Sequence, residues 1–268
     1  MFYGAKNNSI AIDNTKVDYI SFGRGKKNLI MIPGLGEGLR GVKGMAIPFA
    51  MLYKKYAKDF KVYVFSRKRV LPEQYNTMDM ANDIANIMDK IDIDKADVVG
   101  VSEGGMIAQC LAISHPDKIN KLVLVVTTPR PTEYMNVVIN DWIKYADSKD
   151  YKSIFMETAE KSYREKMLKK YRKYYGILSS TVKTKDFSKF ITQAKACLSH
   201  NVYNELNKIK NKTLIIGASD DLIVGVIGSK ELNENIANSE LVIYDGYRHG
   251  VYDEAKDFND KVIEFLNR

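Results

Sequence analysis

Cysteine is scarce in this chain of 268 residues, and the two cysteines it has are far apart. Cys110 and Cys197 lie in segments with helical patterns and form no C-x-x-C motif or other zinc-binding pattern. Disulfide scaffolds and cysteine metal sites need several cysteines at short, regular spacings. We therefore exclude both classes, and we expect two reduced thiols and no metal site.

Long apolar runs are also missing. No segment approaches the length needed to cross a bilayer, and the first residues do not combine basic residues with an apolar stretch as a secretory signal does. We therefore expect a cytoplasmic protein with no membrane span. The hydrophobic content of 45% is nonetheless enough for one large buried core.

Acidic residues are fewer than basic ones, and the formal net charge is +8. Residues 130–190 hold 14 Lys/Arg against 8 Asp/Glu and so supply +6 of this total. The densest part, "KSYREKMLKKYRKYYG" at 161–176, mixes basic residues and tyrosines at helical spacing. No helix-turn-helix, RNP motif or zinc finger accompanies it. We interpret it as a solvated amphipathic helix and predict no nucleic-acid partner.

Strand and helix patterns alternate along most of the chain. The strands are near-continuous apolar runs, which is typical of a parallel sheet covered on both faces. The sequence thus predicts an α/β fold with a mostly parallel central sheet and helices on both faces. The predicted strands lie within residues 17–23, 28–34, 61–66, 97–102, 121–128, 212–221 and 240–246, and the helices between the first five of them within 44–57, 77–91 and 104–116.

The alternation stops after Thr128. Residues 129–211 show only helical stretches rich in lysine and tyrosine, and strand patterns then resume. We predict that 129–211 form a helical cap inserted between two strands of one sheet. Residues 1–128 and 212–268 would together form the core domain.

A serine stands at a sharp strand-to-helix junction, in the sequence Gly100-Val101-Ser102-Glu103-Gly104. The flanking glycines of a G-x-S-x-G motif allow the tight turn that exposes a nucleophilic hydroxyl. A strand pattern before the motif and a helix pattern after it are the context that this turn requires. We therefore expect Ser102 to be a nucleophile.

The chain holds only three histidines to serve as its base. His115 ends the helix that follows Ser102, on the far side from the nucleophile. His200, near the end of the insertion, is expected to be structural or at the surface, although a histidine in the cap could also contact substrate. His249 follows the last predicted strand, at the edge where α/β sites gather. We therefore predict that His249 is the base.

Two consecutive acids, Asp220 and Asp221, follow the strand pattern at 212–218. Aspartate is an ordinary turn or N-cap residue, but a carboxylate here would also complete the chain order Ser, Asp, His. The residues alone leave both aspartates open as the group that orients the histidine.

Taken together, the chain resembles a capped member of the α/β-hydrolase superfamily over essentially its whole length. Each motif is loose by itself, but their order and spacing are specific. The matching pieces are "IPGLGEG", "GVSEGG", "GASDDLIV" and "YRHGVYDE", together with the insertion after the sixth strand of the family's sheet.

The resemblance implies that Ser102 is the nucleophile and His249 the general base and acid. It favours Asp220 as the orienting acid, from a G-x-x-D pattern, with Asp221 second. It further implies that the backbone N–H groups of Leu35 and Glu103 form the oxyanion hole. A serine rather than an aspartate at the turn argues against dehalogenase and epoxide hydrolase chemistry.

The chain departs from the family pattern at three places. Pro33-Gly34 replaces a frequent His-Gly, only Arg67 remains of an Asp-x-Arg-Gly loop, and Asn211-Lys212 replaces a usual proline. None of these positions belongs to the implied triad, but the loop around Arg67 lines the approach to the site in relatives.

The implied activity is two-step acyl transfer on a small-molecule substrate, without a cofactor. A small carboxylic ester is the expected substrate, and an enol-lactone, a thioester, a carbon–carbon bond of a ring-fission product or an N-terminal proline peptide are alternatives. A non-enzymatic ligand receptor of the same fold is the competing class. The sequence gives no oligomeric state.

The predicted cap contains aromatic residues that could close a pocket or simply pack the cap. They are Trp142, Phe155, Tyr163, Tyr171, Tyr174, Tyr175, Phe187 and Phe190.

Overall fold

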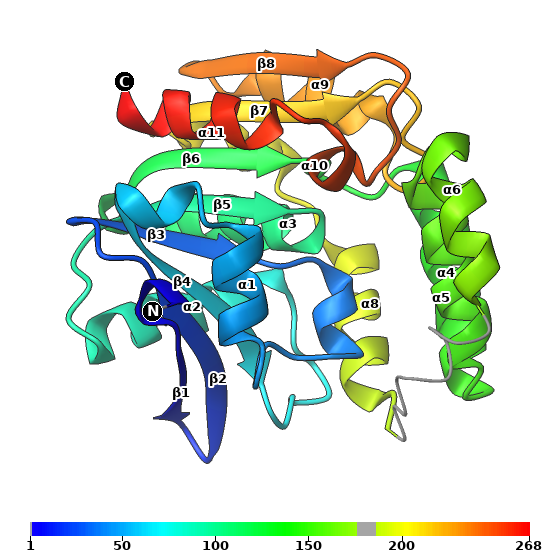
Figure 1. Ribbon diagram of the computed structural model, residues 1–268, viewed down its shortest axis with the longest axis horizontal. Helices are drawn as coiled ribbons and strands as arrows, with labels where there is room; N and C mark the ends of the chain where they lie inside the picture. Colours follow the sequence, from blue (N-terminus) through cyan, green and yellow to red (C-terminus); the bar gives the residue numbers. More distant parts are fainter. Residues whose placement is uncertain (1, 176–185) are drawn as a thin grey trace.

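An eight-stranded sheet forms the centre of the protein in the computed structural model, which describes residues 2–175 and 186–268 (Figure 1). The strand order is β1-β2-β4-β3-β5-β6-β7-β8. β2 pairs antiparallel with both β1 and β4, and all the other pairs are parallel. The predicted fold class is thus confirmed. The strands are β1 Lys6–Ile12, β2 Thr15–Phe22, β3 Lys27–Ile32, β4 Phe60–Lys68, β5 Ala96–Val101, β6 Ile119–Val125, β7 Lys212–Ala218 and β8 Ser239–Tyr244.

β1 is the one strand of this sheet that the apolar patterns do not predict. It is an edge strand of mostly polar residues, and of its side chains only Ile12 is fully buried. It pairs with β2 across a tight turn at Asp13, whose φ is 48°. Because β1 contributes only Ile10 and Ile12 to a core cluster, the rest of this edge strand needs no apolar alternation.

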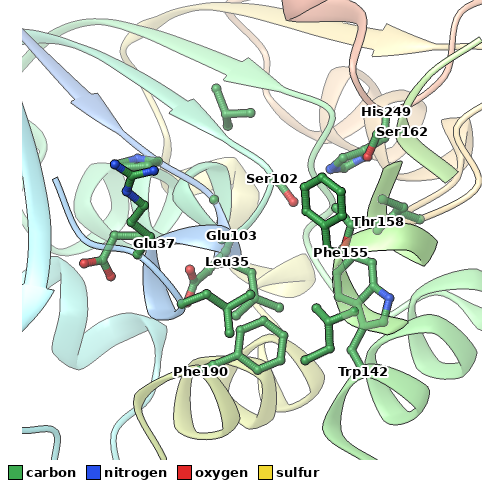
Figure 2. Close-up of a pocket in the computed structure, with 18 of the residues that line it drawn as sticks. Leu35, Glu37, Ser102, Glu103, Trp142, Phe155, Thr158, Ser162, Phe190 and His249 are labelled. Carbon is green, nitrogen blue, oxygen red and sulfur yellow. The ribbon is translucent and has the colours of Figure 1, made fainter. Parts of the chain in front are cut away.

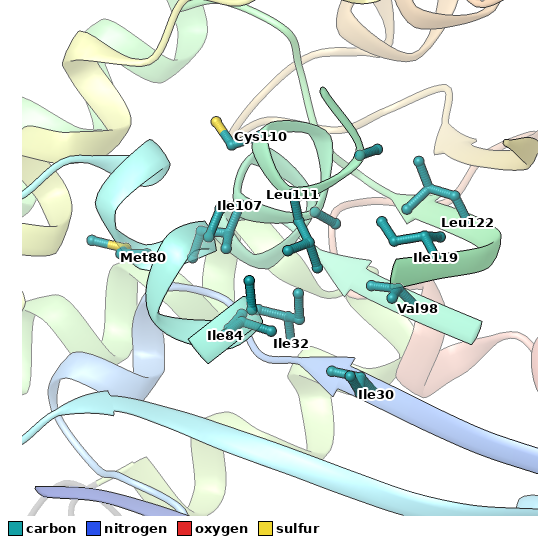
Figure 3. Packing of buried hydrophobic residues seen from close by; sticks show 14 of the residues in the cluster. Ile30, Ile32, Met80, Ile84, Val98, Ile107, Cys110, Leu111, Ile119 and Leu122 are labelled. Atoms are coloured by element: carbon teal, nitrogen blue, oxygen red, sulfur yellow. The ribbon is translucent and has the colours of Figure 1, made fainter. Parts of the chain in front are cut away.

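Helices cover both faces of the sheet. α2 (Thr77–Lys90), α3 (Glu103–Ser114) and α9 (Val226–Asn235) pack on one face, while α1 (Ala46–Leu52) and α11 (Phe258–Asn267) pack on the other. Figure 3 shows the first of these layers, where the side chains of α2 and α3 meet those of β3 and β5. Burial of apolar surface in these two layers stabilises the sheet and so sets where the loops at its carboxyl edge begin.

In the described part of the segment predicted as a cap, four α-helices lie between β6 and β7. α4, α5 and α6 stand beyond the carboxyl ends of the parallel strands (Figure 1). α4 and α8 share an apolar cluster with Leu35, Met106 and Ile223, which belong to the rest of the chain. The helices are α4 Glu133–Asp147, α5 Tyr151–Ser162, α6 Glu165–Tyr171 and α8 Ser188–Ser199.

The basic segment 161–176 is not the single helix that its spacing predicts. The chain leaves helical geometry at Tyr163, where ψ is 150°, so that α5 ends before it and α6 begins after it. Three of its cations, Lys161, Arg164 and Arg172, each pair with a glutamate. Gly176, the last residue of this segment, lies outside the described residues. Among the helices of the described residues, none has the length and apolarity of a bilayer-spanning segment.

Candidate active site

Ser102 lies at the turn between β5 and α3, in a conformation that non-glycine residues rarely adopt, with φ 55° and ψ −120°. The turn is tight enough to require glycines nearby. A Cβ on Gly104 would lie 2.0 Å from a carbonyl oxygen of β3, and one on Gly100 would lie 2.4 Å from the carbonyl oxygen of Gly104. The strained serine backbone, held by its neighbours, is the geometry expected of a nucleophile elbow.

His249 is paired with Asp221. The distance from His249 Nδ1 to Asp221 Oδ2 is 2.8 Å, and both side chains are buried. Asp220, which the family pattern favours, is exposed instead, and its carboxylate accepts a hydrogen bond from the Ser219 hydroxyl at 2.8 Å. The expected pairing of His249 with Asp220 is therefore wrong, because the turn after β7 directs Asp220 outward and Asp221 inward.

Asp221 is fixed by its own turn as well as by the histidine. Its Oδ1 accepts hydrogen bonds from the backbone N–H groups of Ile223 at 2.8 Å and Val224 at 3.1 Å. Burial acts to raise the pKa of Asp221, but the charge and hydrogen bond of His249, together with these two N–H groups, hold that pKa below its ordinary value. The carboxylate is thus ionised and can only accept, so the proton between the two residues belongs to Nδ1 of His249.

The loop that carries His249 (residues 245–250, here the histidine loop) is anchored to the insertion from both sides of His249. The N–H of Gly250 donates to the carbonyl oxygen of Ser162 at 2.7 Å. The Nη1 of Arg248 donates to two further carbonyl oxygens at the carboxyl end of α5, at 2.7 and 3.0 Å. These acceptors have no partner within their own helix, so the arginine both caps α5 and holds the loop.

The other two histidines lie elsewhere. His115 ends α3, and its Nε2 is hydrogen-bonded to Asn82 at 2.9 Å. His200 is buried, its Nδ1 is 2.9 Å from the Thr77 hydroxyl, and burial lowers its pKa to about 3. His200 is therefore neutral near pH 7 and packs in the core behind α2 and α3.

Two backbone N–H groups are available beside Ser102. Leu35 is the first residue of a 3₁₀ helix (Leu35–Gly38), and Glu103 is the first residue of α3. First-turn N–H groups have no acceptor in their own helix and favour negative charge. A Cβ on Gly34 would lie 3.2 Å from Ser102 Cβ, so the loop that carries Leu35 packs directly on the serine.

Ser102 and His249 open onto a cavity of about 640 Å³ (Figure 2). Its walls are mainly aliphatic and aromatic, and they come from both the core and the insertion. Of the aromatics considered in the insertion, Tyr174 is 55% exposed, whereas Phe187 and Tyr175 pack in apolar clusters. Those that line the cavity are Trp142, Phe155, Tyr163, Tyr171 and Phe190.

A buried ionic cluster lies beside the N–H groups of Leu35 and Glu103. Arg67 Nη2 is 3.1 Å from Glu103 Oε2, and Lys189 Nζ of α8 is 2.7 Å from Glu37 Oε1. Burial raises the pKa of Glu103 to about 7, although Arg67 opposes the shift. For Glu37, burial is outweighed by Lys189 and Arg67, so its pKa is lowered.

Sequence reasoning misses Arg248 and the Glu37–Lys189 pair as parts of this site. Arg248 stands next to the predicted base, but its acceptors are backbone carbonyls, which no residue pattern reveals. Glu37 lies within the quoted "IPGLGEG" motif, and the acid in that motif is the one signal that could have drawn attention to it.

The comparisons with known proteins agree with this architecture. A family model described as alpha/beta hydrolase fold matches residues 27–256. A Caulobacter segnis protein, provisionally named carbamate hydrolase RutD, is 25% identical over 90% of this chain and 92% of its own. The 2-hydroxymuconate semialdehyde hydrolase of Pseudomonas sp. strain CF600 is 26% identical over 89% and 86%. The enol-lactonase structure from Burkholderia xenovorans LB400 superimposes with a TM-score of 0.81 at 20% identity, covering 97% of this chain and all of its own.

Proposed function

The chain belongs to the alpha/beta hydrolase fold family, and from this premise we propose that it is a serine hydrolase with Ser102, Asp221 and His249 as its catalytic triad. The observation that carries the proposal is the buried 2.8 Å contact of His249 with Asp221, on the same cavity as a serine in elbow geometry. This arrangement supports a role of the carboxylate in orienting a base toward a nucleophile.

The tautomer of His249 determines which of its ring nitrogens can accept a proton. Since Nδ1 of His249 carries the proton shared with Asp221, its Nε2 has a free lone pair and accepts the proton of the Ser102 hydroxyl as that oxygen attacks a carbonyl carbon. The oxygen of the tetrahedral intermediate is stabilised by the N–H groups of Leu35 and Glu103. His249 then protonates the leaving group, and the same histidine activates water to release the acyl group from Ser102.

The cavity favours an uncharged acyl substrate of modest size. Its volume of about 640 Å³ lies in the range of small-molecule sites, and its apolar walls would exclude water around the reacting carbonyl. We therefore propose a small carboxylic ester as the substrate class. The names of the similar proteins supply the competing classes: a carbamate, an enol-lactone and 2-hydroxymuconate semialdehyde.

A substrate panel with one matched variant tests this proposal. p-Nitrophenyl esters of increasing acyl length, an aryl carbamate, an enol-lactone and a ring-fission product are each assayed with the wild type and with Ser102→Ala. We expect ester turnover in the wild type alone, with the variant showing the same circular dichroism spectrum and melting temperature. Turnover of every class near the buffer rate would instead favour a ligand receptor of the same fold.

A further inference from the structure

Arg67 is a fully enclosed cation beside the proposed site, although it has no contact with the reacting atoms. It lies at the carboxyl end of β4, and its side chain is 2% exposed. Two of its nitrogens, Nε and Nη1, have no hydrogen-bond partner within the described residues. Such burial of a guanidinium group is costly, so its contacts require an explanation.

The third nitrogen, Nη2, makes two contacts that join both halves of the proposed oxyanion hole. It donates to the carbonyl oxygen of Pro33 at 2.6 Å and to Glu103 Oε2 at 3.1 Å. Pro33 precedes Leu35 by two residues in the same loop, and Glu103 is itself the second proposed donor. One rigid group thus contacts the segments that carry both N–H groups.

The same loop is anchored on its other side by the insertion. Glu37, two residues after Leu35, accepts hydrogen bonds from Lys189 at 2.7 Å and from Gln193 at 3.1 Å, both in α8. Lys189 also contacts the backbone carbonyl oxygen of Arg67 at 3.4 Å. The loop with Leu35 is therefore fixed between Arg67 and α8.

We propose that Arg67 is a positioning residue, which sets the separation and direction of the Leu35 and Glu103 N–H groups and so stabilises the transition state rather than the bound substrate. This inference rests on the proposed function. Donors of an oxyanion hole act only when they are already in place as charge develops. A small displacement of either donor should lower kcat and leave KM nearly unchanged.

The test compares Arg67→Met and Arg67→Lys with a control, Arg69→Lys. Arg69 lies two residues further along, pairs with Asp18 of β2 and is 44% exposed. Active sites are first counted by titration with a fluorophosphonate, so that any misfolded fraction is removed from the calculation. kcat, KM and the inhibition constant of an alkyl trifluoromethyl ketone, which forms a tetrahedral oxyanion adduct, are then measured per titrated site.

We expect Arg67→Met to lower kcat about 100-fold with KM within threefold, and to weaken the ketone by a similar factor. Arg67→Lys keeps the charge but loses the planar fork of the guanidinium group, so its kcat and its affinity for the ketone should lie between those of Arg67→Met and the wild type. If Arg67→Met yields no titratable protein, Arg67→Lys decides the question.

A kcat and a ketone affinity within threefold of the wild type in the Arg67 variants, with only a lower melting temperature, would overturn the positioning role. Failure of the proposed function has a different signature. In that case the wild type itself would have no serine that the fluorophosphonate titrates, or would turn over every substrate of the panel only near the buffer rate.

Discussion

Replacing Asp221 by asparagine should nearly abolish turnover while keeping the shape of the site. Asp221 Oδ1 faces two backbone N–H donors, at 2.8 and 3.1 Å. The amide oxygen of an asparagine must occupy that position, because its NH₂ group cannot face two donors. The NH₂ group is then directed at Nδ1 of His249 and donates to it.

This reversal fixes the wrong tautomer of His249. Nδ1 becomes the acceptor, so the proton moves to Nε2, and the ring can no longer take a proton from Ser102. By analogy with serine proteases the loss in kcat is on the order of 10⁴, or about 5 kcal/mol of transition-state stabilisation. The assay is hydrolysis of the best ester of the panel, followed to low rates at high enzyme concentration.

Asp220→Asn is the matched control for this measurement. Asp220 is exposed and contacts only the neighbouring Ser219 hydroxyl through its carboxylate in the described residues, so the variant should keep most of its activity. If Asp221→Asn kept a kcat within tenfold of the wild type while Asp220→Asn lost its activity, the assignment of Asp221 as the residue that orients His249 would be refuted.

Three further predictions concern stability and substrate range. Burial raises the pKa of Glu103 to about 7, so the folded protein retains a proton that the unfolded chain releases near pH 4.3, and stability falls as pH rises between these values. From pH 5 to pH 8, the free energy of unfolding in urea should therefore fall by about 2 to 3 kcal/mol more in the wild type than in Glu103→Gln. Equal falls in the two proteins would disprove the pKa shift. In the same assay, Gly104→Ala should lower the free energy of unfolding by about 3 kcal/mol or more, because its Cβ would lie 2.0 Å from a backbone oxygen. Gly36→Ala, with open space around it, should change the free energy of unfolding little. Phe155→Ala enlarges the cavity, so it should raise the ratio of kcat/KM for long-chain esters to kcat/KM for short-chain esters about tenfold. The same ratio for Tyr174→Ala, at an exposed position, should equal that of the wild type.

The parts of the fold that sequence predicts are those with strong local causes. The buried parallel strands have continuous apolar runs, and the turn at Ser102 requires small residues on both sides because a Cβ at Gly104 has no space. β1 is missed because its exposed polar residues carry no such pattern. His249 can be proposed as the base because the chain offers so few histidines.

Contacts that depend on the path of the backbone are beyond sequence reasoning. Asp220 and Asp221 are chemically identical neighbours, and only the turn that bonds Asp221 to the next residues decides which one faces His249. Likewise, the hydrogen bonds between the histidine loop and the end of α5 are accepted by backbone carbonyl oxygens, which every residue possesses. The break at Tyr163 separates α5 from α6 within a segment whose spacing alone predicts one helix.

The most direct test of the central claim is a mass measurement on the labelled nucleophile. The folded protein is incubated with an alkyl fluorophosphonate, its intact mass is recorded, and the modified peptide is sequenced. The account predicts one adduct per chain, on Ser102, which is absent in Ser102→Ala and forms much more slowly in Asp221→Asn. An adduct on a different residue, or a folded wild type that remains unmodified while esters are hydrolysed, would contradict the claim that Ser102 is the nucleophile.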